Sequence, residues 1–147
     1  MHFRVPLLVF LALQIGACSF LTRQQAYEKM VERFEFRLSE LAGVGAEDCG
    51  SYGWEDDGSA QIQCGNSAAE VGRAFRLYGR VPGLDSVLYK GIARNSGGEV
   101  FLIIGDSDVR GGGGWWAKPK VFAVLCAAHK GPMTLENVFD CIDRREI

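Results

Sequence analysis

Two carboxylates near the middle of the chain are the first residues whose spacing could support chemistry. Asp106 and Asp108 are two positions apart, so at the end of a strand both side chains would point to the same side. Such a pair can hold a calcium ion, or keep one member protonated for general acid catalysis. Arg110 occupies the next alternate position, where a calcium loop needs another oxygen ligand. We therefore expect a hydrogen-bonded turn, with a metal site or catalytic carboxylates as the alternatives.

An enzyme built around this pair would need His129 as its base, because the other histidine, His2, lies in the N-terminal leader described below. The sequence has no G-x-S-x-G motif, no H-E-x-x-H motif and no phosphate-binding glycine loop. We therefore favour a non-enzymatic module and expect no cofactor. A small hydrolase or metal-assisted enzyme using Asp106, Asp108 and His129 is the alternative.

A glycine tract followed by two tryptophans is the most unusual stretch of the sequence. Residues 111–114 are all glycine, and Trp115 and Trp116 follow directly. Ordering such a tract costs backbone entropy, whereas tryptophan is enriched at binding hot spots and suits the membrane interface. We interpret this loop as a candidate contact site for a partner protein, a glycan or the membrane surface. The alternative is that both rings only cover the core.

Basic residues are concentrated in the middle of the chain, where residues 71–130 carry nine bases and four acids. Arg76 and Arg80 would project from one side of a predicted strand, and Lys90 and Arg94 could lie alongside them. An anion-binding face is therefore a second candidate site, with a solvated sheet surface as the alternative. The overall net charge of -2 argues against a dedicated nucleic-acid binder.

The N-terminus has the order of an export signal, with Arg4, an apolar run over residues 5–13, and small residues before Cys18. The apolar run is too short to cross a bilayer, which takes about 20 apolar residues. The four residues that end this segment resemble the lipobox of bacterial lipoprotein precursors, in which an aliphatic residue and two small residues precede an obligatory cysteine: Ile15-Gly16-Ala17-Cys18.

This resemblance implies that residues 1–17 are a cleaved signal peptide and that the Cys18 thiol receives a diacylglyceryl group in a thioether bond. The new amine of Cys18 would then be acylated, for example with palmitate. Two or three acyl chains give stable anchoring. By the same resemblance, Ser19 implies sorting to the outer membrane, facing the periplasm, where aspartate would imply retention in the inner membrane. An uncleaved anchor over residues 5–21 and an ordinary secreted protein are the alternatives.

The remaining residues, 18–147, have the length and composition of one domain. Their four other cysteines would be exported to an oxidising compartment, where an even set favours disulfides. The two neighbouring pairs have equal separations of 15, so Cys49 with Cys64 and Cys126 with Cys141 is our preferred connectivity among the three possible ones. A four-thiolate zinc site would require closely spaced cysteine pairs, which are absent.

Hydrophobic periodicity predicts an α+β fold. An amphipathic N-terminal helix begins with a capping box at Thr22 and ends near Gly43, and a disulfide-closed loop or weak hairpin follows over residues 44–65. A short helix begins at Ser67, and a final helix is capped by Thr134. Between these helices, four strands would form an antiparallel sheet in a two-layer sandwich: residues 75–81, 87–94, 100–105 and 121–126.

Overall fold

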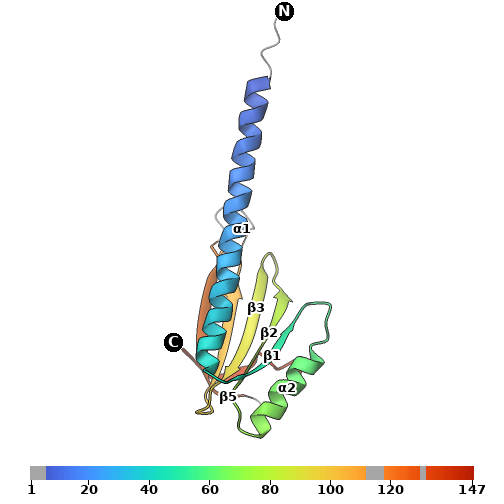
Figure 1. Cartoon of the computed structure of the whole chain (residues 1–147), viewed down its shortest axis with the longest axis vertical. Coiled ribbons are helices and arrows are strands. Elements are labelled where there is room, and N and C mark those ends of the chain that lie inside the picture. The colour runs from blue at the N-terminus through green and yellow to red at the C-terminus, as the bar shows by residue number, and fades with distance from the viewer. Residues whose placement is uncertain (1–5, 112–117, 130–131) are drawn as a thin grey trace, which may run out of the picture.

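The computed structural model describes residues 6–111, 118–129 and 132–147, and these residues form two helices and six strands (Figure 1). This composition confirms the mixed α+β class. The elements in chain order are α1 (Pro6–Ala42), β1 (Glu47–Tyr52), α2 (Ser59–Glu70), β2 (Phe75–Pro82), β3 (Val87–Arg94), β4 (Val100–Asp106), β5 (Lys120–His129) and β6 (Cys141–Glu146).

The six strands form one sheet in chain order, with β1 and β6 at its edges. β1 is parallel to β2, and all other neighbouring strands are antiparallel. Strands β2 to β5 are the four that the sequence predicted, but the prediction of a four-stranded sheet was wrong because it missed both edges. β1 and β6 are rich in charged residues or glycine, which are depleted in strands or used to protect exposed edges.

The two helices lie on opposite faces of the sheet, so the predicted two-layer sandwich is also wrong. On one face, Phe34 and Leu38 of α1 pack into a cluster with apolar residues of β3, β4 and β5. On the other face, Ile62 of α2 packs into a second cluster with Phe75 and Leu77 of β2. Each central strand therefore buries side chains on both of its faces.

Two glycines let α1 lie close to the sheet. A Cβ atom at Gly91 would lie 2.8 Å from Leu38, and one at Gly105 would lie 2.8 Å from the Met30 sulfur. Any larger residue would force the Leu38 or Met30 side chain to move, so glycine favours this close approach of helix and strands. The C-terminal half of α1 is therefore an integral part of the fold.

The helix itself begins earlier than predicted. α1 starts at Pro6, so Thr22 lies within it and does not cap its N-terminus. No helix in the described part of the chain has both the length and the apolar character that a membrane crossing requires.

The predicted C-terminal helix is absent, and its residues form a run of turns that leads into β6. Val138 N donates to Thr134 O at 2.8 Å, but Asp140 N already donates to Asn137 O in a tighter turn. Cys141 then pairs with His129 at the start of β6 and is disulfide-bonded to Cys126 of β5. The apolar spacing of this segment favours a helix, but the pairing with β5 makes its last residues a strand.

The segment over residues 44–65 also differs from its prediction. It forms β1 and the first part of α2 instead of a hairpin, and Ser67 lies inside α2. Asp57 accepts hydrogen bonds from Ser59 N at 3.0 Å and from Ser59 Oγ at 2.8 Å. The Asp57-Gly58 turn therefore leads into a helix, with Gly58 in the left-handed region at φ 63°.

Candidate functional site

The Asp106–Asp108 segment is a hydrogen-bonded turn. Asp106 Oδ1 accepts from Asp108 N at 2.9 Å, and Asp108 Oδ1 accepts from Arg110 N at 3.3 Å. Asp108 is only 4% exposed. Each carboxylate therefore has an oxygen that helps to close the turn, which is the structural interpretation that the sequence favoured.

His129 lies far from this turn along the sheet. Asp106 pairs with Lys120 at the start of β5, and His129 is the last residue of the same strand. Nine residue steps of about 3.3 Å separate Lys120 from His129, which gives a distance of about 30 Å along the strand. A single catalytic centre made of Asp106, Asp108 and His129 is therefore excluded.

Trp115 and Trp116, the aromatic contact site expected from the sequence, lie outside the described residues. The glycines at positions 112–114 also lie outside them. The proposed contact role of this loop stays a prediction.

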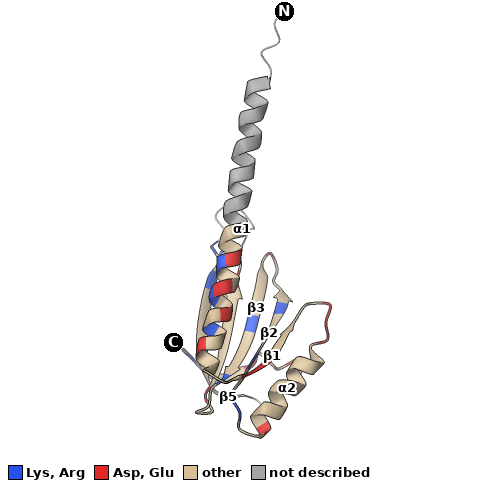
Figure 2. Cartoon of the chain, in the orientation of Figure 1, with Lys and Arg blue, Asp and Glu red and all other residues tan. Residues whose placement is uncertain are grey.

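The four central bases do not form one face. Across the β2–β3 ladder, Arg76 is opposite Ala93 and Arg80 is opposite Tyr89, whereas Lys90 is opposite Gly79 and Arg94 is opposite Phe75. Residues paired in this way share a sheet face. Arg76 and Arg80 therefore lie on the α1 face, and Lys90 and Arg94 lie on the α2 face. Acids and bases also interleave along the C-terminal half of α1, so the helix adds no single-sign surface (Figure 2).

Both arginines on the α1 face already have structural contacts. Arg76 Nη2 lies 2.8 Å from Asp48 Oδ2, and Arg76 Nη1 also donates to Ser39 Oγ on α1. The hydrogen bond from Arg76 holds the pKa of Asp48 below its usual value. The Arg80 guanidinium lies 4.4 Å from the centre of the Trp54 ring, a cation–π contact. Arg76 therefore links β2 to α1 and β1, and Arg80 links β2 to the segment that follows β1.

Two tyrosine hydroxyls, one on each face of the sheet, have raised pKa values. Tyr52 is 6% exposed, and burial raises the pKa of its hydroxyl to about 12. On the other face, burial and a 2.7 Å hydrogen bond between the Tyr27 and Tyr89 hydroxyls raise the pKa of Tyr89. Neither hydroxyl is therefore activated as a nucleophile at neutral pH.

Both predicted disulfides are present. Cys49 of β1 is bonded to Cys64 of α2, with a Cα–Cα distance of 5.6 Å. Cys126 of β5 is bonded to Cys141 of β6, with a Cα–Cα distance of 5.2 Å. Each bridge therefore attaches one edge strand to a neighbouring element.

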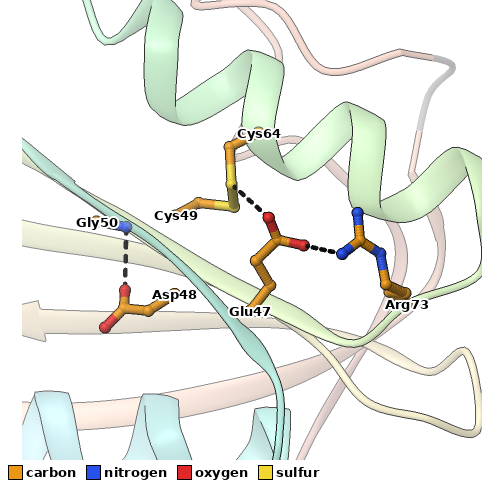
Figure 3. Close-up of a disulfide and its surroundings, with 6 residues drawn as sticks. All are labelled: Glu47, Asp48, Cys49, Gly50, Cys64 and Arg73. Atoms are coloured by element: carbon orange, nitrogen blue, oxygen red, sulfur yellow. Dashed lines mark hydrogen bonds and ion pairs between the residues drawn. A yellow bond between two sulfur atoms is a disulfide. The ribbon is translucent and has the colours of Figure 1, made fainter.

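A carboxylate lies beside the first bridge (Figure 3). Glu47 Oε1 is 3.7 Å from Cys64 Sγ, and Glu47 Oε2 is 2.9 Å from Arg73 Nη1. Glu47, Cys49 and Cys64 are the one group of potential metal ligands gathered in the described part of the chain. Both sulfurs are used in the disulfide, so neither is available as a thiolate ligand.

We expect Glu47→Gln to accelerate reduction of the Cys49–Cys64 bridge by dithiothreitol. A thiolate that attacks Cys49 expels Cys64 as a second thiolate, and both negative charges develop near Glu47. Repulsion between unit charges at about 4 Å in water is about 1 kcal/mol, which corresponds to roughly a fivefold change in rate. The rate is measured by alkylation and mass spectrometry. The Cys126–Cys141 bridge of the same variant is the internal control, and equal acceleration of both bridges would contradict the prediction.

A pocket between α2 and the sheet is the feature that sequence reasoning missed. Its volume is about 270 Å³, and its residues come from α2, three strands and the segment before β6: Asn66, Ala69, Glu70, Phe75, Ile92, Arg94, Val100, Pro132 and Met133. Phe75, Ile92 and Met133 are buried and form the floor. Asn66 fixes one wall, because its amide exchanges two 2.9 Å hydrogen bonds with the Met133 backbone.

No known family, curated protein or solved structure matches this chain. The interpretation of the pocket therefore depends on its own geometry. A largely apolar pocket with a few polar groups at its mouth is typical of small-ligand sites. The pocket is the best candidate site among the described residues, and its volume lies just below the usual range of about 300 to 1,000 Å³.

Proposed function

We propose that this protein is a non-enzymatic cell-envelope lipoprotein that binds a partner or ligand in the periplasm. Cys18 would carry the lipid, and residues 18–147 would form the binding module. The Ile15-Gly16-Ala17-Cys18 motif supports the anchor, and two disulfides suit an oxidising compartment. The separation of Asp106 from His129 gives no support to the enzymatic alternative.

The observation that carries this proposal is the position of the pocket relative to α1. β2 runs antiparallel to α1, since Arg76 contacts Ser39 near the end of the helix and Tyr78 contacts Glu35 one turn earlier. Phe75, at the start of β2, therefore lies near the C-terminal end of α1, and the pocket lies there with it. Cys18 lies in the opposite half of the helix. A module anchored at Cys18 would present this pocket away from the membrane.

The anchor is tested by labelling cells with palmitate. We expect the native chain to incorporate label and to sediment with membranes, and Cys18→Ala to lose the label and most of the membrane-bound fraction. One acyl chain alone binds weakly and reversibly, whereas two or three anchor stably. Ser19→Ala is the matched control and should remain labelled. An unlabelled native chain would contradict the lipoprotein assignment.

The same cells test the destination and the partner. For the proposed sorting, we expect the native chain in the outer-membrane fraction and the Ser19→Asp variant in the inner-membrane fraction.

Crosslinking in intact cells should then capture a partner of the native chain, an envelope protein or a glycan. We expect the capture to be lost when the pocket is filled by Ala69→Phe, and a capture pattern identical in both chains would contradict a binding role for the pocket.

A further inference from the structure

Two residues of opposite charge line the apolar pocket without pairing with each other. Arg94 and Glu70 both line it. The ion pairs among the described residues join Arg37 with Glu40, Arg73 with Glu47, and Arg76 with Asp48, so neither Arg94 nor Glu70 takes part in one. The pocket therefore combines an apolar floor with two charges that form no ion pair within the described part of the chain.

The Arg94 guanidinium is partly satisfied and has donors left over. Its Nη1 donates to the Arg73 carbonyl oxygen at 2.9 Å, which fixes the direction of the side chain. A guanidinium has five N–H donors, and within the described residues Arg94 makes no second side-chain hydrogen bond. Because Arg94 sits opposite Phe75 in the β2–β3 ladder, its charge is held beside the apolar floor.

The two charges differ in how well each is prepared to hold a ligand. Glu70 is exposed at the last position of α2, whereas Arg94 is partly buried. Water already solvates an exposed carboxylate, so a ligand ammonium would gain little from pairing with it. The Arg94 guanidinium is already oriented by its hydrogen bond to the Arg73 carbonyl oxygen, and a carboxylate can bind a guanidinium through two parallel hydrogen bonds.

The volume limits the apolar part of the ligand. About 270 Å³ equals the liquid volume of about nine water molecules. This space accepts a short alkyl chain or one large apolar side chain, and it is too small to enclose a long-chain lipid.

We propose that the pocket binds a carboxylate that carries a short apolar group, with the apolar group on Phe75, Ile92 and Met133 and the carboxylate on Arg94. This inference rests on the proposed binding function and names its ligand class. Two sources share this chemistry, a free medium-chain carboxylic acid and the C-terminal residue of an apolar peptide.

The test uses the purified full-length chain in detergent micelles and titrates three probes by isothermal calorimetry. Octanoate is the carboxylate probe, octanol has the same chain without the charge, and N-acetyl-leucine represents a peptide C-terminus. We expect octanoate to bind at least tenfold more tightly than octanol. Tighter binding of N-acetyl-leucine than of octanoate would identify the peptide source, and the reverse order would identify the free acid.

Three variants assign the site. Arg94→Gln should lower the affinity for octanoate at least tenfold and change the affinity for octanol less than twofold. Arg110 is exposed and lies outside the pocket, so Arg110→Gln should change neither affinity. Ala69→Phe places a ring in the pocket from an exposed helix position and should abolish binding of all three probes. Circular dichroism and the urea midpoint of each variant verify folding, so that Ala69→Phe still tests the site if Arg94→Gln unfolds.

Equal affinity for octanoate and octanol, or octanoate binding that survives Ala69→Phe, would overturn this inference. Either result would leave the lipoprotein assignment intact, because palmitate labelling and fractionation measure the anchor independently. A native chain that binds octanoate but incorporates no palmitate would contradict the lipoprotein assignment and support the ligand class of the pocket.

Discussion

Phe34→Ala should lower the free energy of unfolding by about 3 to 5 kcal/mol, the usual cost of truncating a buried phenylalanine. Phe34 is fully buried, and its ring lies 5.4 Å from the Tyr78 ring and 5.6 Å from the Tyr89 ring. Gly91 and Gly105 also approach this ring, and backbone held this close cannot collapse easily into the cavity. Since domains are stable by about 5 to 15 kcal/mol, the loss is a large part of the total.

Phe36→Ala is the matched control on the same helix. Phe36 is 70% exposed, so its truncation should change stability by about 0.5 kcal/mol or less. Urea denaturation followed by circular dichroism measures both variants. Equal midpoints for the two variants would mean that α1 is a stalk and not part of the core.

The four central strands could be predicted, the first from its alternation and the others from apolar runs bounded by turns, but their environment could not. Phe75 and Leu77 alternate with Arg76 and Tyr78, which is typical of a strand with one wet face. The second face is instead covered by α1, since Tyr78 donates to Glu35 and Arg76 contacts Ser39. Polar side chains that contact a covering helix give the same alternating sequence pattern as polar side chains that face water.

The division of the basic residues depends on register, which the sequence does not display. Alternation alone places Arg76 with Arg80 and Lys90 with Arg94, but it does not relate one strand to the other. The pairing of Arg80 with Tyr89, and of Gly79 with Lys90, places the two sets on opposite faces. A shift of one residue would have united them.

The prediction of a C-terminal helix was wrong because strand pairing and a disulfide compete with the helix for the same residues. Leu135, Val138 and Phe139 have helical spacing, yet Leu135 is 56% exposed and Val138 is 1% exposed. Cys141 must reach Cys126 on β5, and few residues remain for a helix before that point. Short helices are marginal without tertiary packing, so the disulfide and the strand pairing prevail.

The pocket could not be predicted because its parts are distant in sequence. Ala69 and Met133 are 64 positions apart, and no local motif links them. The disulfides, by contrast, depended on compartment and spacing alone, which the sequence displays. Contacts between residues that are distant in sequence leave no local pattern from which they could be predicted.

Each disulfide should contribute about 3 kcal/mol to stability, because each closes a loop with a sequence separation of 15 residues. Replacing both cysteines of one pair with alanine leaves no free thiol to form new bridges. The variant without Cys49 and Cys64 and the variant without Cys126 and Cys141 should therefore lose similar amounts. For a domain of this size, each loss corresponds to a fall in Tm of about 10 °C.

The variant that lacks both bridges tests whether these contributions are independent. The two loops do not overlap in sequence, and the bridges fasten different edges of the sheet, β1 through α2 and β6 through β5. Effects at separate sites usually add, so we expect a total loss of about 6 kcal/mol by urea denaturation. Much of the variant should then be unfolded at 37 °C, since the total stability of such domains is about 5 to 15 kcal/mol. A loss no larger than that of one bridge would show that the two edges unfold together.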